Sequence, residues 1–278
     1  MQPLTPCHTA PLFLPLSQEL QNILRNLSAD DWLRPTLAGA WRVRDVAAHL
    51  LDGQWRRLSA QRDAHQPPPD RIIKSDRDLA GFINAFNAGG VAYGARLSTR
   101  VLTDLLDLSG RQVAEVFGAL DPHAPALYGV SWAGEQVSEN WMDVGREYTE
   151  HWHHQMQIRE AVGRPRLLAP SWMLPLIEMS VRALPHAYAG VRAPNGTVVT
   201  LAVTGETAGA WSLVRGPDRW GIERGRPSSP DAIVTVQADD VWRMFYNALS
   251  DDALRSRVVM EGEADLVAPL LRTRSVVV

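Results

Sequence analysis

The chain has 278 residues, 45% of them hydrophobic, and this length and composition favour two globular domains over one. Its 28 basic and 31 acidic residues are interspersed and give a net charge of −3, which argues against a nucleic-acid-binding face. The single cysteine, Cys7, excludes an internal disulfide and a cysteine-rich metal site and fits a reducing cytoplasm. Prolines interrupt residues 1–15 and no long apolar run follows, so we expect neither a signal peptide nor a membrane span.

Helical spacing of apolar residues dominates the first 165 residues. The predicted helical segments, in chain order, are 16–27, a short turn near Trp32, 43–62, 78–108, 109–120 and 140–162. Gly89 and Gly90 cost the third segment roughly 2 kcal/mol against alanine, so we expect either a break there or close packing against a neighbour. Ser109 is predicted as the N-cap of the next helix. The last helix should stop at Gly163, because glycine and proline follow it.

The pattern changes after Pro170, where period-two alternation typical of strands replaces helical spacing. The expected elements are a helix over 171–188, strands over 197–203, 209–214, 219–223, 232–236 and 258–262, and helices over 238–249 and 263–271. This order predicts an α+β layer with a mostly antiparallel sheet. We therefore expect an α+β two-domain chain, with domains 1–168 and 169–278.

The helix over 140–162 carries potential metal ligands. Glu150 and His154 are four residues apart and lie on one helix face, so their side chains can reach one divalent cation. Glu147 and His151 form a second pair with the same spacing, and spacing alone leaves the choice open. The best candidate for a third ligand is His49, in the middle of the amphipathic helix over 43–62.

Two segments resemble the metal-ligand segments of the mycothiol-dependent maleylpyruvate isomerase family, a branch of the DinB-like helical bundles. They are residues 41–50, Trp-Arg-Val-Arg-Asp-Val-Ala-Ala-His-Leu, and the pattern Arg146-x3-Glu150-x3-His154. The similarity also covers 27–32, 84–98 and 131–135. It implies an N-terminal four-helix bundle and a small C-terminal sterol-carrier-protein-like α+β domain.

By the same resemblance, His49, Glu150 and His154 bind a divalent metal: zinc in first place, with nickel, iron or manganese as alternatives. The implied thiol cofactor is mycothiol. In the family's namesake reaction the thiolate adds to the double bond of maleylpyruvate, the bond rotates, and elimination returns fumarylpyruvate. The resemblance thus implies a cytoplasmic isomerase, or a thiol S-transferase, that acts on a small molecule.

Further residues are candidates for the rest of the site. Arg146 and Arg96 are candidates to bind a substrate carboxylate, since the planar guanidinium binds carboxylates in bidentate fashion; the alternative for each is a salt bridge between helices. Asn84, Asn87, Trp132 and Glu135 match family-like segments and are candidates to line the thiol cavity, each with a structural alternative. Asp45, one turn before His49, is the candidate to orient that imidazole. Trp211, Arg219 and Trp220 receive no firm assignment, and Gln155 and Gln157 stand where many relatives carry an aspartate.

Two functions of other classes compete with the thiol-dependent enzyme. A metal-stabilised binding protein would hold an apolar ligand in the C-terminal domain, and a metal hydrolase would use bound water. Retained activity without thiol favours the hydrolase. Tight lipid binding without turnover favours the binding protein.

Overall fold

The computed structural model describes residues 1–276 and divides into two compact units. Among the described residues, one unit comprises 8–127 and 150–166, and the other comprises 1–7, 128–149 and 167–276. The two units share helix α5 (Asn140–Ala161), because the division falls between Thr149 and Glu150. The domain boundary at 168/169 stays a prediction. Within residues 1–276 no helix is both long and apolar enough to cross a membrane.

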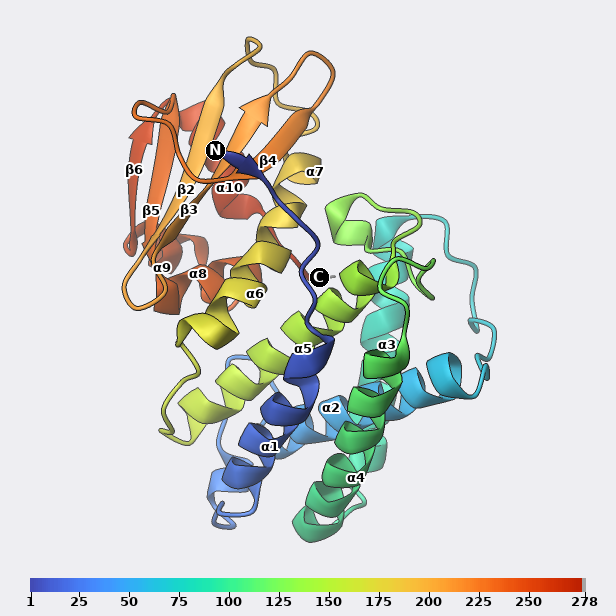
Figure 1. Cartoon of the computed structure of the whole chain (residues 1–278). Coiled ribbons are helices and arrows are strands. Elements are labelled where there is room, and N and C mark those ends of the chain that lie inside the picture. Colours follow the sequence, from blue (N-terminus) through green and yellow to red (C-terminus); the bar gives the residue numbers. More distant parts are fainter. Residues whose placement is uncertain (277–278) are drawn as a thin grey trace. The chain divides into compact units, whose positions relative to one another are not determined.

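The first unit is a helical bundle. Its helices are α1 (Phe13–Leu24), α2 (Val43–Arg57, continued by a π-helical turn over Leu58–Arg62), α3 (Asp76–Gly94), α4 (Thr99–Ala119) and the second half of α5 (Figure 1). A short 3-10 helix, Asp31–Leu33, carries Trp32 into the core. The helices predicted over 16–27, 43–62 and 140–162 therefore exist, with ends that differ by a few residues, whereas the segments predicted over 78–108 and 109–120 are divided at residues 95–98 and not at 109.

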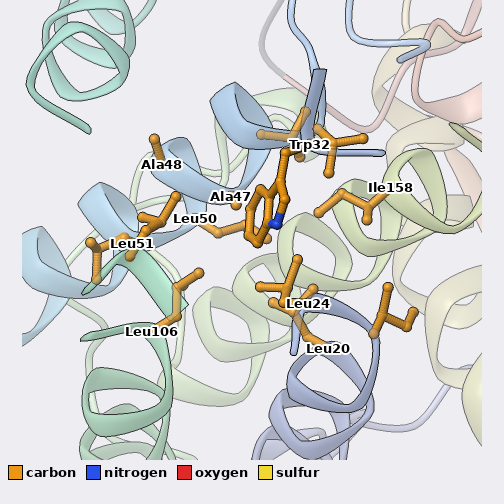
Figure 2. Packing of buried hydrophobic residues seen from close by; sticks show 13 residues of the cluster. Leu20, Leu24, Trp32, Ala47, Ala48, Leu50, Leu51, Leu106 and Ile158 are labelled. Atoms are coloured by element: carbon orange, nitrogen blue, oxygen red, sulfur yellow. The ribbon is translucent and has the colours of Figure 1, made fainter. Parts of the chain in front are cut away.

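The bundle core surrounds the indole of Trp32 (Figure 2). It combines Leu20 and Leu24 from α1, Leu50 from α2, Leu106 from α4 and, from α5, Ile158, which is fully buried. Burial of such side chains stabilises the fold by about 1.5–3 kcal/mol each. Because α2 and α5 contribute to one core, their facing side chains have fixed positions.

Ser109 and the Gly89–Gly90 pair were the subjects of two sequence-based expectations for this unit. The prediction of a helix N-cap at Ser109 is wrong: Ser109 lies inside α4, is buried, and donates its hydroxyl to Leu105 O and to Gln54 Oε1. The N-cap is Ser98, whose hydroxyl accepts the Val101 N–H. At the glycine pair the helix continues, and Gly90 provides the expected close packing, since a Cβ there would meet the Asp52 side chain at 2.3 Å.

The second unit contains a six-stranded sheet in the order β1-β4-β3-β2-β5-β6. Its strands are β1 (Gln2–Pro3), β2 (Val198–Thr204), β3 (Gly209–Arg215), β4 (Trp220–Arg224), β5 (Ala232–Gln237) and β6 (Val258–Gly262). Among the strand pairs of the described residues only β2–β5 is parallel. The expected mostly antiparallel sheet is confirmed.

Helices complete this unit. They are α6 (Pro170–Ser180), α7 (Leu184–Ala187), α8 (Ala238–Phe245), α9 (Asp251–Arg255) and α10 (Ala264–Arg272). Helices α8 and α10 pack against the sheet, α8 on β5 and β2 and α10 on β5 and β6. The indoles of Trp211 and Trp220 are buried and donate to Glu178 Oε1 and Val191 O, so both tryptophans are structural. The predicted α+β class is confirmed; strand β1 and helix α9 were not expected.

Candidate metal centre

Three side chains from α2 and α5 meet at one point in the bundle. Nε2 of His49 lies 3.1 Å from Oε1 of Glu150, and Nε2 of His154 lies 3.2 Å from the same oxygen. The ligand atoms of the three side chains all lie within 4.8 Å of one another. In the described part of the chain this is the only such group of three histidine, cysteine or acidic side chains. The structure thus brings together the set that the sequence predicted, while the ligand role of these residues stays a proposal.

The local sequence explains why these side chains are held. His49 is 4% exposed and sits between buried residues of α2, with Ala48 before it and Leu50 after it. Helix α5 is anchored to the bundle by Arg159, which donates to Glu19 Oε2 at 2.6 Å and to Pro165 O at 2.6 Å. These contacts fix α5 against α1, next to the segment that carries Glu150 and His154.

The second nitrogen of each imidazole has a different environment. Nδ1 of His154 lies 2.8 Å from Oε1 of Gln157, and both residues are buried. An amide oxygen only accepts, so Nδ1 carries the proton. Nδ1 of His49 is buried with no hydrogen-bond partner among the described residues. The suggestion that Asp45 orients His49 is therefore wrong: Asp45 accepts the Arg42 N–H at 2.9 Å and caps α2.

Aromatic rings border the cluster. The Trp41 ring centroid lies 5.0 Å from that of His49 and 6.3 Å from that of His154. His153 stacks obliquely on His154 with centroids 4.1 Å apart, and its Nδ1 lies 3.9 Å from Glu150 Oε2. These rings exclude water from one side of the imidazoles, whereas the Glu150 side chain stays 30% exposed. The cluster is therefore buried but not sealed.

The acidities of these groups reflect the same geometry. Burial lowers the pKa of His49, against the hydrogen bond to Glu150, which raises it. Burial alone would raise the pKa of Glu150, but the charge of His154 and the hydrogen bonds from both imidazoles hold it well below its usual range. At neutral pH the cluster therefore contains a carboxylate beside an imidazole that stays neutral.

The donor set fits a divalent cation. In the tautomer with the proton on Nδ1, which Gln157 Oε1 can accept, the lone pair on Nε2 of His154 is available to a cation together with the carboxylate oxygen 3.2 Å away. A tetrahedral site with bonds near 2.0–2.1 Å keeps its ligand atoms about 3.3 Å apart. The two measured distances are close to that value. Two imidazoles and one carboxylate form the ligand set of catalytic zinc sites with an open position.

Glu147 and His151, the alternative pair of metal ligands, make other contacts. Glu147 forms an ion pair with Arg146 at 2.7 Å, and the ring of His151 packs edge-on against Phe13 with centroids 5.4 Å apart. Neither residue belongs to the three-residue group. These contacts favour the register Glu150/His154.

The other predicted residues of the bundle lie on or after α3. Asn84 is exposed on α3 and Arg96 is exposed in the turn that follows it. Asn87 is half-buried, and its Oδ1 accepts from Arg56 Nη2 at 2.8 Å. No contact that the structure records joins these three residues to the imidazoles. Their functional roles stay predictions.

The remaining predicted residues belong to the other unit. Trp132 is half-buried and packs on a small cluster of Val130, Met142 and Met179. Glu135 accepts the hydroxyl of Ser138, which closes the loop between them. Arg146, on the first half of α5, pairs with Asp143 at 2.8 Å and with Glu147. Both of these partners of Arg146 lie on its own helix, so these pairs are not the salt bridge between helices that was its alternative, and the functional roles of the three residues stay predictions.

Sequence reasoning missed two contacts of the cluster, those of Gln157 and Trp41. Gln157 was noted only as a departure from relatives, although its place three residues after His154 puts the two side chains on one helix face. Trp41 was quoted within a motif and given no role. The three-residue spacing between His154 and Gln157 on α5 was the sequence signal that could have revealed this contact.

Comparisons with known proteins agree with this architecture. Residues 13–159, more than half of the chain, match the family model of the mycothiol maleylpyruvate isomerase N-terminal domain. The crystal structure of the mycothiol-dependent maleylpyruvate isomerase is similar to this chain at 12% sequence identity, with a TM-score of 0.54. The alignment covers 92% of this chain and 94% of the isomerase chain. A histidine-to-alanine mutant of that isomerase gives a TM-score of 0.53 at the same identity and coverage. At this identity the similarity concerns the fold.

Two further results complete the comparison. The sterol carrier protein 2 like 2 from Aedes aegypti is 26% identical, with 34% of this chain and 96% of that chain covered, but its TM-score of 0.25 is too low to define a fold. A search of curated proteins finds no match. The family expected from the motifs is nevertheless confirmed, and the chain belongs to the mycothiol maleylpyruvate isomerase N-terminal domain family.

Proposed function

We propose that this protein is a metal-dependent enzyme that uses a low-molecular-weight thiol, mycothiol in first place. The reaction is the isomerisation of a maleylpyruvate-like unsaturated acid or the transfer of the thiol to an electrophile. The observation that carries the proposal is the convergence of two imidazole nitrogens on one carboxylate oxygen, with Nδ1 of His154 turned away from it towards Gln157 Oε1. Membership of the family supports the thiol.

The residues have separate tasks in this proposal. His49, Glu150 and His154 hold the cation, zinc in first place, and Gln157 fixes the ring orientation of His154. When bound, the cation supplies the positive charge that lowers the pKa of a thiol at its open position. The partial exposure of Glu150 leaves the cluster accessible on one side. Small molecules can therefore approach without unfolding of the bundle.

A substrate carboxylate needs a fixed cation. Arg96 is proposed for this role because its side chain is exposed and accessible. Arg146 is the second proposal, and its two acidic partners mean that a substrate carboxylate has to compete with Asp143 and Glu147. Asn84, Asn87, Trp132 and Glu135 remain proposed contacts of the thiol.

Metal content and thiol binding test the proposal together. Elemental analysis of the purified protein should find one divalent metal per chain, and mycothiol should raise its thermal unfolding midpoint. His49→Ala and His154→Ala should lose most of the metal. His151→Ala, on the same helix, is the matched control and should keep it. A variant set in which His151→Ala empties the site and His154→Ala leaves it filled would show that the register is wrong.

Turnover assays separate the possible reactions. An isomerase returns the thiol unchanged, so its total thiol concentration stays constant while the substrate is converted. An S-transferase consumes one thiol for each electrophile. Activity that persists after all thiol is removed would contradict both and indicate a hydrolase that uses bound water.

A further inference from the structure

A cavity of about 450 Å³ lies between α2 and α3, within the bundle unit. Its walls consist of residues from two helices, namely Ala48, Leu51, Asp52 and Trp55 of α2, and Ala85, Phe86, Gly89, Gly90, Tyr93 and Gly94 of α3. The volume falls in the range of about 300–1,000 Å³ that is usual for small-molecule sites. None of the proposed metal ligands belongs to these walls, so the cavity is a feature of its own.

Glycines define the shape of this cavity. Two of them bring the helices into contact: a Cβ at Gly90 would meet Asp52 at 2.3 Å, and one at Gly94 would meet the Cβ of Ala48 at 2.4 Å. A Cβ at Gly89 meets nothing within 4 Å. Gly89 is therefore a position in the cavity lining where a side chain can be added without a steric clash.

One charged side chain, Asp52, lies in the walls. Its Oδ2 atom is buried and accepts no hydrogen bond among the described residues. Arg56 Nε lies 2.9 Å from this oxygen, in an ion pair without hydrogen-bond alignment. A carboxylate oxygen can accept more than one hydrogen bond, so a ligand with a hydrogen-bond donor can bind to Oδ2 of Asp52 beside Arg56.

Aromatic rings form the rest of the surface. The rings of Trp55 and Tyr93 meet edge-on with centroids 6.3 Å apart. The ring of Phe86 is held by Arg56, whose Cζ lies 4.9 Å from the ring centroid, and Arg56 is tied in turn to Asn87 at 2.8 Å. Phe86 and Tyr93 are 43% and 52% exposed, although large apolar side chains are usually buried. Rings held in this way are suited to pack on another ring.

We propose that this cavity binds an apolar, ring-bearing small molecule that carries an amine or hydroxyl hydrogen-bond donor. The rings of Trp55, Phe86 and Tyr93 contact the apolar part, and Oδ2 of Asp52 accepts the donor. Acidic ligands bind weakly, because the lining contains no basic side chain to pair with them and the neighbouring Arg56 is already paired with Asp52. The proposal does not depend on the metal or on the thiol.

A neutral aromatic amine, N-phenyl-1-naphthylamine, provides the test. The full-length protein should bind it in the cavity with an increase in probe fluorescence. Gly89→Leu fills the cavity and should weaken binding at least about tenfold. Gly81→Leu is the matched control, since Gly81 lies on the same helix outside the cavity and its Cβ also meets nothing within 4 Å. Gly81→Leu should bind the probe as the unchanged protein does, and both variants should keep their metal.

A second probe tests the role of Asp52 as the hydrogen-bond acceptor. Anilinonaphthalene sulfonate has similar rings and a negative charge, so it should bind at least about tenfold more weakly, and Asp52→Asn should reduce that difference. If Gly89→Leu fails to fold, Ala85→Phe blocks the same cavity from an exposed position of α3. Absence of binding to the unchanged protein, or equal binding to the blocked and control variants, overturns the proposal.

Discussion

Replacement of Gln157 by leucine tests the geometry of the metal cluster. Leucine has a similar volume but offers no acceptor to Nδ1 of His154, which now lies 2.8 Å from the amide oxygen. Gln157 is 4% exposed, so water cannot take its place and the buried N–H loses its partner. Such a loss costs about 1–3 kcal/mol. Loss of the partner that orients a ligating imidazole weakens metal binding by about 10- to 100-fold.

Competition with a chromophoric zinc chelator measures this effect on full-length protein. Gln157→Leu should bind zinc about 10- to 100-fold more weakly and unfold at a lower temperature. Gln157→Glu keeps an acceptor at the same place and adds negative charge, so it should bind zinc at least as tightly as the unchanged protein. Gln136→Leu, at an exposed position, controls for the gain in hydrophobicity. Zinc affinity of Gln157→Leu within twofold of the unchanged protein would refute the assigned contact.

Three further predictions concern the fold and the free thiol. Gly94→Val should lower the free energy of unfolding of the bundle in urea by roughly 1–3 kcal/mol, because a Cβ at Gly94 lies 2.4 Å from the Cβ of Ala48. A Cβ at Gly81 meets nothing within 4 Å, so Gly81→Ala should raise that free energy by up to about 1 kcal/mol. Burial, together with Glu178 and against Arg182, raises the pKa of Cys7 to about 11. A free thiol has a pKa near 8.5, so alkylation of Cys7 at pH 8 should be about two orders of magnitude slower and should accelerate as the pH rises towards 11; a rate equal to that of free cysteine contradicts the burial. A fragment that ends near Pro170 should stay helical and keep its metal; aggregation with loss of metal shows instead that the C-terminal domain completes the core or the site.

Local signals in the sequence predicted most of the elements. The stop of α5 is an example: Gly163 takes the left-handed backbone conformation, with φ of 66°, and Arg164 N–H returns to Arg159 O at 2.8 Å. Serine as a helix cap was recognised but assigned to the wrong residue, because Ser98 and Ser109 both precede apolar runs. Ser98 follows the turn after Gly94, whereas the hydroxyl of Ser109 bonds inside the bundle.

Most contacts between residues far apart in the chain could not be predicted from the sequence. Strand β1 is two residues long and pairs with Arg224 and Glu223 near the other end of the chain, so no periodicity reveals it. The candidate metal ligands could be named because helical spacing and family motifs coincide at Glu150 and His154. That Asp45 caps α2 instead of contacting His49, while Gln157 contacts His154, depended on side-chain directions, which only the packed helices define.

Cobalt substitution in a Cys7→Ser background tests the central claim most directly, because it reports the metal, its open position and the thiol in one spectrum. On addition of mycothiol near neutral pH, a thiolate at the cation should produce an intense sulfur-to-cobalt charge-transfer band, with release of one proton per chain. The same titration of His154→Ala should give no band. Absence of the band at saturating mycothiol in the protein with all three ligands, together with full turnover without thiol, would contradict the account.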